Sequence, residues 1–191
     1  VTSAMPGEGK STVSANIAIS LAMKGYKVIL VDADLRNPST AKVLGMQEQE
    51  LGTLQVLKGE VKIEDAVQPY KDTSVMVLAG SSPIQDTSTV LSGENMRQFI
   101  KELEAKADFV VIDTPPSAML SDAAIVAQYV DGAVFVIRQD YTEADRILEG
   151  MEILSSSGAQ ITGCILNDAN VKGNSSEHYK NSYRLKGEVK V

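Results

Sequence analysis

The chain has 191 residues, of which 43% are hydrophobic and 23% charged, so it fits one globular domain rather than two. Its 18 Lys and Arg against 25 Asp and Glu give a formal net charge of −7, which argues against nucleic-acid binding through a general positive field. A single cysteine excludes an intrachain disulfide and favours a reducing compartment. No apolar run approaches the roughly 18 residues of a membrane span.

Short apolar runs alternate with helical patterns along the whole chain. Strands are expected at residues 27–32, 75–79, 109–113, 132–138 and 161–167, and helices at 10–24, 92–106, 122–129 and 142–157. Continuous apolar runs are typical of strands that are buried on both faces of a parallel sheet. The pattern predicts an α/β fold with a mostly parallel sheet and helices on both faces. Residues 37–72 are less regular and are expected to form a long connection with one or two short helices.

The strongest motif lies at residues 4–12, AMPGEGKST. It matches the phosphate-loop pattern G-x-x-x-x-G-K-[ST], except that Ala4 replaces the first glycine. The segment before it resembles the end of a strand, so we expect the chain to begin inside that element. Lys10 can reach the β- and γ-phosphates and the Ser11 hydroxyl can bind Mg²⁺. The motif predicts a nucleotide site made by Pro6, Gly7, Glu8, Gly9, Lys10, Ser11 and Thr12.

Three acids follow predicted strands: Asp32 and Asp34 in VDADLR, and Asp113 in VIDTPP. Ligands of open α/β sheets bind beyond the carboxyl ends of the strands, so these acids are expected beside the phosphate loop. Mg²⁺ is commonly held by one or two carboxylates together with substrate phosphates. We expect Ser11, Asp34 and Asp113 to hold the metal. Of Asp32 and Asp34, one would touch the metal and the other accept a proton.

Two further side chains allow two interpretations each. Arg36 would either neutralise phosphate or pair with an acid. Asn167 ends the last predicted strand, where it would either hydrogen-bond an adenine edge or form a turn. Both are candidate nucleotide-binding residues.

The end of the chain differs from the rest in composition. Residues 168–191 are polar, have few aliphatic side chains and carry Tyr179 and Tyr183. We expect a nucleotide-binding domain over residues 1–167 and a flexible tail over 168–191.

The motifs at residues 3–12, 31–36 and 111–116 together resemble the catalytic domain of bacterial tyrosine kinases of the capsule and exopolysaccharide synthesis family. The resemblance extends to Asn167 and implies a P-loop NTPase fold with ATP and Mg²⁺ as cofactors. Lys10 and Ser11 match the Walker A motif of the family, Asp32 and Asp34 its second Walker motif, and Asp113 its Walker B motif. It implies γ-phosphoryl transfer to tyrosine, with Lys10, Asp32, Asp34 and Asp113 as catalytic residues and Asp32 as the first candidate proton acceptor.

The same resemblance implies partners and a location. Family members assemble into homo-oligomeric rings, phosphorylate tyrosines in the tail of a neighbouring subunit, and are activated by the cytoplasmic segment of a membrane-spanning partner. We therefore expect a cytoplasmic protein at the inner face of the plasma membrane, with protein tyrosines as substrates and no nucleic acid. Tyr179 and Tyr183 are the expected autophosphorylation sites, although family tails usually carry a denser tyrosine cluster.

The alternative function is an ATPase switch of the MinD and ParA type, which hydrolyses ATP without phosphorylating protein. Such ATPases usually carry a signature lysine near the start of the loop, where this chain has Met5. Met5 favours the kinase interpretation. A non-catalytic nucleotide-binding partner of a membrane assembly is the third possibility, and the intact Lys10 and acids argue against it.

Overall fold

The computed structural model describes residues 1–47 and 49–170. Its strands are β1 (Thr2–Ser3), β2 (Val28–Asp32), β3 (Gln68–Pro69), β4 (Val75–Leu78), β5 (Phe109–Asp113), β6 (Ala133–Arg138) and β7 (Ile161–Asn167). Its helices are α1 (Lys10–Ala22), α2 (Thr40–Leu44), α3 (Thr53–Leu57), α4 (Ile63–Ala66), α5 (Gly93–Glu104), α6 (Asp122–Val126), the 3₁₀ helix η1 (Ala127–Tyr129) and α7 (Ala144–Ser156).

The strands form two hydrogen-bonded groups, ordered β3-β4-β2-β5 and β1-β6-β7. Every pairing is parallel except that of β3 with β4. Backbone contacts join the groups at β1 and β5, because Val1 N donates to Ile112 O (2.6 Å) and Thr114 N donates to Val1 O (3.1 Å). The result is one mostly parallel sheet, as the sequence predicts. β1, and hence the phosphate loop, lies in its interior between β5 and β6.

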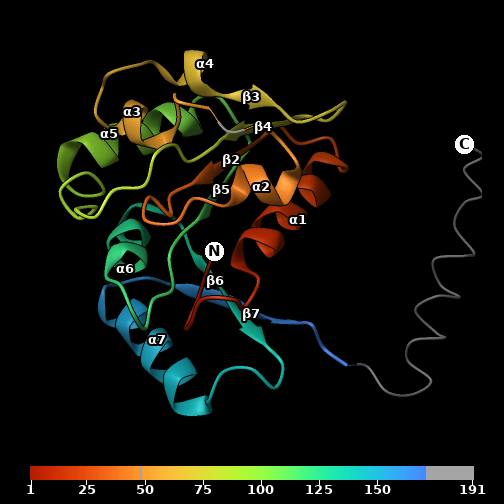
Figure 1. The fold of residues 1–191 in the computed structure, drawn as a ribbon, viewed down its shortest axis with the longest axis vertical. Coiled ribbons are helices and arrows are strands. Elements are labelled where there is room, and N and C mark those ends of the chain that lie inside the picture. Colours follow the sequence, from red (N-terminus) through yellow and green to blue (C-terminus); the bar gives the residue numbers. More distant parts are fainter. Residues whose placement is uncertain (48, 171–191) are drawn as a thin grey trace, which may run out of the picture.

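Helices cover both faces of the sheet around β2, which explains the continuous apolar run of that strand (Figure 1). β7 differs, because its residues are exposed or half-buried although its sequence is a similar apolar run. In β2, Val28 and Leu30 pack into a cluster with α1 and α2. Ile29 and Val31, which point to the opposite face, pack into a second cluster with α3, α4 and α5. Because β2 is buried on both faces, its carboxyl end is fixed in position, and with it Asp32 and Asp34.

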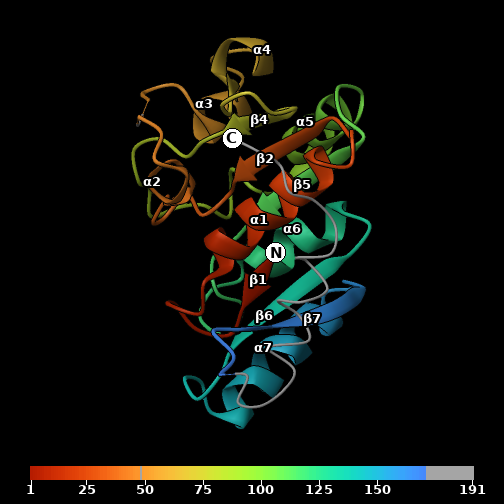
Figure 2. The same cartoon turned by 90° about the vertical axis from the view of Figure 1, so that its right-hand side faces the viewer.

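The other part of the sheet is covered on one face by α6 and α7. Figure 2 shows β6 and β7 side by side with α7 next to them. Phe135 of β6 is fully buried and packs with Leu154 of α7 and with Ala4, which begins the phosphate loop. This small cluster anchors the start of the loop to the core.

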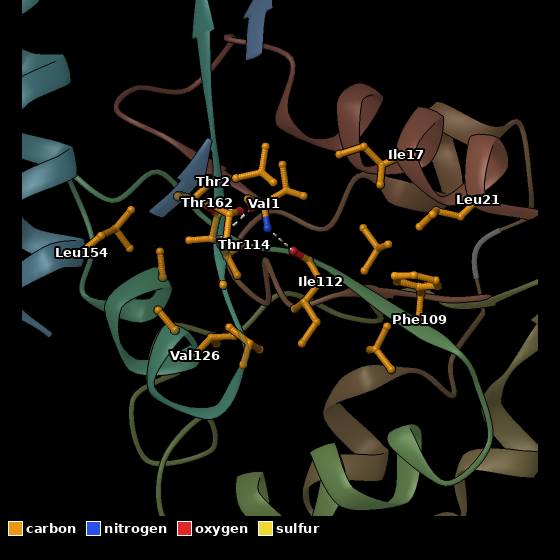
Figure 3. A pocket seen from close by; sticks show the side chains of 18 residues that line it. Val1, Thr2, Ile17, Leu21, Phe109, Ile112, Thr114, Val126, Leu154 and Thr162 are labelled. Atoms are coloured by element: carbon orange, nitrogen blue, oxygen red, sulfur yellow. Dashed lines mark hydrogen bonds between the residues drawn. The ribbon is translucent and has the colours of Figure 1, made fainter. Parts of the chain in front are cut away.

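A cavity of about 380 Å³ lies beside the seam between β1, β5 and β6 (Figure 3). Its lining includes Ile17 and Leu21 of α1 and Phe109 at the start of β5, and no charged side chain. It extends toward the amino ends of β5 and β6, away from the acids at the carboxyl ends of the strands. It therefore lacks the chemistry of a phosphate site.

The predicted elements are confirmed within two or three residues at each end, with local differences. Residues 37–72 contain three short helices and β3, which the sequence does not predict because Gln68–Pro69 is a two-residue edge strand that contains proline. The helix expected at 122–129 splits into α6 and η1. No helix in the described part of the chain is long and apolar enough to span a bilayer. Tyr179 and Tyr183 lie outside the described residues.

Candidate active site

The phosphate loop turns sharply between β1 and α1. Gly7 has a φ of 82° and Gly9, which immediately precedes α1, has a φ of 91°. These left-handed conformations are strained for other residues, so the two glycines allow the bend that the motif predicts. The loop ends at the amino terminus of α1, where unpaired N–H groups favour an anion.

The loop forms one wall of a pocket of about 320 Å³. The other walls are the segments that follow β2 and β5. The pocket is lined by Pro6, Gly7, Gly9, Lys10, Ser11, Thr12, Asp34, Arg36, Asn37, Ser39, Val43, Pro115, Pro116, Met119 and Leu120. The loop residues Lys10 and Ser11 thus share one space with Asp34, which follows a different strand. Lys10 is only 8% exposed, and no carboxylate of the described residues lies within 4.0 Å of its amine.

Asp113 lies next to the pocket residues Lys10 and Ser11, in a buried environment that disfavours its charged form. β2 and β5 pair in a register that sets Asp32 opposite Asp113, and both side chains are fully buried. Burial raises the pKa of Asp113, while hydrogen bonding to Ser11 and the charge of Lys10 oppose the rise. Its Oδ1 accepts a hydrogen bond from Ser14 Oγ (3.2 Å), and its Oδ2 has no hydrogen-bond partner among the described residues.

Asp113 Oδ2, the oxygen without a hydrogen-bond partner among the described residues, suits a hydrated metal ion bound next to the Ser11 hydroxyl. No group of three or more His, Cys, Asp or Glu side chains comes together as a metal cage within residues 1–47 and 49–170. Mg²⁺ does not require such a cage, because it usually keeps several waters and binds through one or two carboxylates and the substrate phosphates. Ser11 and Asp113 therefore suit Mg²⁺ that arrives with a nucleotide, and metal binding by Asp34 stays a prediction.

The structure separates the roles of Asp32 and Asp34. Asp32 Oδ2 accepts the N–H groups of Ser39 and Thr40 at the start of α2 (both 2.9 Å), and Oδ1 accepts that of Asp34 (3.1 Å). Burial, and then the charge of Asp113, raise the pKa of Asp32 to about 6. Asp34 lines the pocket beside Lys10, and burial raises its pKa as well. Asp32 thus orders the segment, whereas Asp34 faces the site.

Two serines near the candidate metal ligands, Ser14 and Ser39, are not among the residues that the sequence predicts. Ser39 Oγ lies 2.7 Å from Ser11 Oγ, so it holds the hydroxyl that would bind the metal. Ser14 contacts Asp113 and could have been found, because it lies one helical turn after Lys10 and therefore on the same face of α1. No sequence pattern points to Ser39.

Arg36 is held by an acid rather than free for phosphate. Its Nε donates to Asp122 Oδ2 (2.8 Å), and its Nη2 donates to Thr87 Oγ1 (2.6 Å). Asp122 is fully buried, which makes the pair a structural anchor. Arg36 still lines the pocket. Its contacts agree with the second interpretation, in which it pairs with an acid.

Asn167, at the end of β7, contacts the loop itself. Its Nδ2 donates to Glu8 O (2.8 Å), a contact that neither sequence interpretation anticipates. Adenine binding by this residue remains a prediction.

Comparisons with known proteins agree with this geometry. A family model described as ParA, NUBPL iron-transfer P-loop NTPase, matches residues 1–191. The tyrosine-protein kinase YwqD of Bacillus subtilis (strain 168) is 35% identical over 179 residues, covering 94% of this chain and 75% of YwqD. The VpsO kinase domain has a TM-score of 0.82 at 34% identity, covering 88% of this chain and 83% of VpsO.

MinD of Pyrococcus horikoshii OT3, solved with Mg-ADP, is also similar, with a TM-score of 0.72 at 28% identity over 86% of this chain and 67% of MinD. The identity and coverage are higher for the tyrosine kinases than for this ATPase. The chain therefore belongs to the nucleotide-binding ParA-like P-loop NTPases and, within them, to the family of bacterial tyrosine kinases.

Proposed function

We propose that the chain transfers the γ-phosphoryl group of ATP to protein tyrosines, including its own. The observation that carries the proposal is the shared pocket of Lys10, Ser11 and Asp34, with the buried Asp113 next to Lys10 and Ser11. Membership in the tyrosine kinase family supports tyrosine as the acceptor.

Catalysis in such a site consists mainly of positioning and charge neutralisation. The loop N–H groups and the Lys10 ammonium would hold the phosphate oxygens. Mg²⁺, when bound, neutralises charge on those oxygens, and Ser11 and Asp113 would hold it.

Asp34 is the group we assign to take the proton of the attacking tyrosine. Asp32, the first candidate from the sequence, uses both oxygens on backbone N–H groups and is fully buried. Asp34 faces the pocket, and the burial that raises its pKa makes it a stronger base than an ordinary aspartate.

The biological setting follows from the family resemblance. The acceptors would include Tyr179 and Tyr183 on a neighbouring subunit, and the protein would regulate capsule or exopolysaccharide synthesis. An activating cytoplasmic segment of a membrane-spanning partner would bring it to the inner face of the plasma membrane.

The assay that separates kinase from ATPase uses γ-labelled ATP with Mg²⁺. For the kinase we expect label on tyrosine in the wild type, none in Lys10→Met, and wild-type labelling in Lys24→Met, a matched change of an exposed lysine just beyond the other end of α1. Label released only as free phosphate would instead identify the MinD-type ATPase. Absence of both, with the activating partner supplied, would contradict either enzyme.

The assignment of the base is tested with Asp34→Asn and Asp32→Asn. We expect Asp34→Asn to lose tyrosine phosphorylation while it still binds ATP with Mg²⁺. Asp32→Asn should keep a larger share of the activity. The assignment is wrong if Asp34→Asn phosphorylates tyrosine at the wild-type rate.

A further inference from the structure

A fully buried acid lies inside the phosphate loop, where a negative charge is unexpected. Glu8 has 0% exposure and belongs to the loop that would surround a highly anionic triphosphate. Burying a carboxylate is costly unless hydrogen bonds compensate for the lost water. Its contacts therefore indicate what the charge does.

None of the donors to the Glu8 carboxylate belongs to a residue that lines the pocket. Oε2 accepts the N–H of Met5 (2.7 Å), which closes a small ring within the loop. Oε1 accepts the Thr142 hydroxyl (2.9 Å) and, at 3.4 Å, the N–H of Arg138. Arg138 ends β6 and Thr142 lies in the connection from β6 to α7, and neither they nor Glu8 lines the pocket.

The neighbouring carbonyls are held on the same side. Gly7 O accepts Arg138 Nη1 (3.3 Å), and Glu8 O accepts Asn167 Nδ2 (2.8 Å). The described residues contain no cis peptide bond, and a trans peptide directs its C=O and N–H in opposite directions. Carbonyls directed toward β6 and β7 therefore direct the N–H groups of Glu8 and Gly9 toward the pocket.

We propose that Glu8 is a positioning residue whose carboxylate, bonded to Met5 N and Thr142 Oγ1, keeps the loop amides directed at the phosphates of the nucleotide. All of these contacts are made within the chain, so they would leave little ordering of the loop to be done when the anion binds. The inference rests on the proposed nucleotide site, and it concerns phosphate binding rather than transfer to tyrosine.

The direct test measures binding of inorganic tripolyphosphate with Mg²⁺, which has no base or sugar, by titration calorimetry. We expect Glu8→Gln and Thr142→Val each to weaken binding about tenfold, the scale of a lost hydrogen bond to a charged group. The double variant should lose less than the sum of the two single variants, because both changes affect the Glu8–Thr142 contact. Thr142→Ser keeps the hydroxyl and should bind as the wild type does.

The sign of the Glu8→Gln effect separates the proposal from simple electrostatics. Removal of a negative charge near phosphate would tighten binding if the charge acted only through repulsion. Tighter or unchanged binding, independent losses in the double variant, or a Thr142→Ser variant as weak as Thr142→Val would each overturn the proposal. If Glu8→Gln does not fold, the Thr142 pair decides the outcome alone.

Two measurements keep other causes apart. A role only in folding would lower the urea midpoint of Thr142→Val without changing its affinity for tripolyphosphate, and that result would also overturn the proposal. Thr89→Val removes a hydroxyl bonded to the exposed Asp86 and should change neither quantity much. If the wild type itself bound no tripolyphosphate or ATP, the proposed function would fail; if only the variants were unaffected, it would stand and Glu8 would have no positioning role.

Discussion

Asp113 and Asp32 face each other across two paired strands, and both carboxylates are fully buried. Two like charges at short range in a poorly solvated interior oppose each other's ionisation, so the pair stores unfavourable energy in the protein without its metal. Functional sites commonly carry such a cost in stability.

Replacing Asp113 by asparagine should therefore stabilise the fold while it removes function. In EDTA at neutral pH, we expect Asp113→Asn to raise the free energy of unfolding by about 1 kcal/mol, since a buried charge is removed with little change in shape. Tyrosine phosphorylation should be lost. Urea unfolding and the labelled-ATP assay measure the two effects. A lower free energy of unfolding for Asp113→Asn would contradict the unfavourable energy that we assign to the buried Asp32–Asp113 pair.

The raised pKa of Asp32 predicts how stability depends on pH. Its pKa is about 6 in the folded protein against an ordinary value of 3.8, so the folded state binds more protons between these values. The contribution of Asp32 to stability is then most favourable below about pH 4, decreases as the pH rises to about 6, and stays low above that.

Urea unfolding of the metal-free protein at pH 4.5 and pH 7.5 measures this contribution. We expect the wild type to lose on the order of 2 kcal/mol more than Asp32→Asn between these pH values, because the amide does not titrate. Equal losses in the two proteins would show that Asp32 ionises normally.

At the scale of elements, the junction of the phosphate loop with α1 depends on Gly9. A Cβ atom at Gly9 would collide with the Asn167 side chain of β7, and the φ of 91° already disfavours other residues. Gly25, which follows α1, has a nearly identical φ of 92°, but a Cβ atom there would meet only open space. Both glycines thus have a backbone conformation that would strain another residue, but only Gly9 also has a side chain close to the position of a Cβ atom.

The pair Gly9→Ala and Gly25→Ala separates strain from crowding. Gly25→Ala should lower the free energy of unfolding by about 1 kcal/mol and leave ATP affinity unchanged. Gly9→Ala should in addition weaken ATP binding about tenfold, because either the Asn167 amide gives up its hydrogen bond to Glu8 O or the loop moves. Equal ATP affinity in the two variants would contradict the close approach of loop and strand.

The elements that the sequence predicts well have local causes. The loop signature gives the start of α1, and the two-sided burial of β2 and β5 makes their apolar runs continuous. The short helices α3 and α4 are fixed instead by distant contacts, such as Thr53 N with Ala79 O and the burial of Ile63. Contacts between residues so far apart in the chain leave no local sequence pattern from which the helices could be predicted.

The same distinction applies to the site. Lys10, Ser11 and Asp34 were predictable because a motif and the ends of parallel strands bring them to one edge. The partners of Arg36 lie 49 and 86 residues away at Gln85 and Asp122, so spacing could not choose between its two interpretations. The outward direction of Glu8 likewise depends on Thr142, which lies 134 residues later.

At the scale of the molecule, Asp122 links three distant segments. It accepts hydrogen bonds from Arg36, which follows β2, and from Thr87, which lies between β4 and α5, while it begins α6 itself. Removal of one partner of a buried ion pair leaves an uncompensated charge, which is strongly destabilising.

We expect Asp122→Ala to lower the free energy of unfolding by about 2–3 kcal/mol, somewhat less than for a wholly buried pair because Arg36 is 31% exposed. Glu94→Ala, which removes the exposed Glu94–Arg97 pair, should cost less than about 0.5 kcal/mol. Urea unfolding measures both, and similar losses would show that Asp122 does not connect these segments.

For the proposed ATP site, the commitment of Arg36 to Asp122 would favour one form of the nucleotide over another. Among the described lining residues, Lys10 is then the cation left for a triphosphate, and it faces Asp34 with Asp113 close by. The formal charge of −7 on the whole chain adds a general repulsion. Metal-free ATP would enter against this field, whereas its magnesium complex brings its own countercharge. The protein would therefore respond to the supply of magnesium-bound ATP rather than to total ATP, which couples its output to the ionic state of its surroundings.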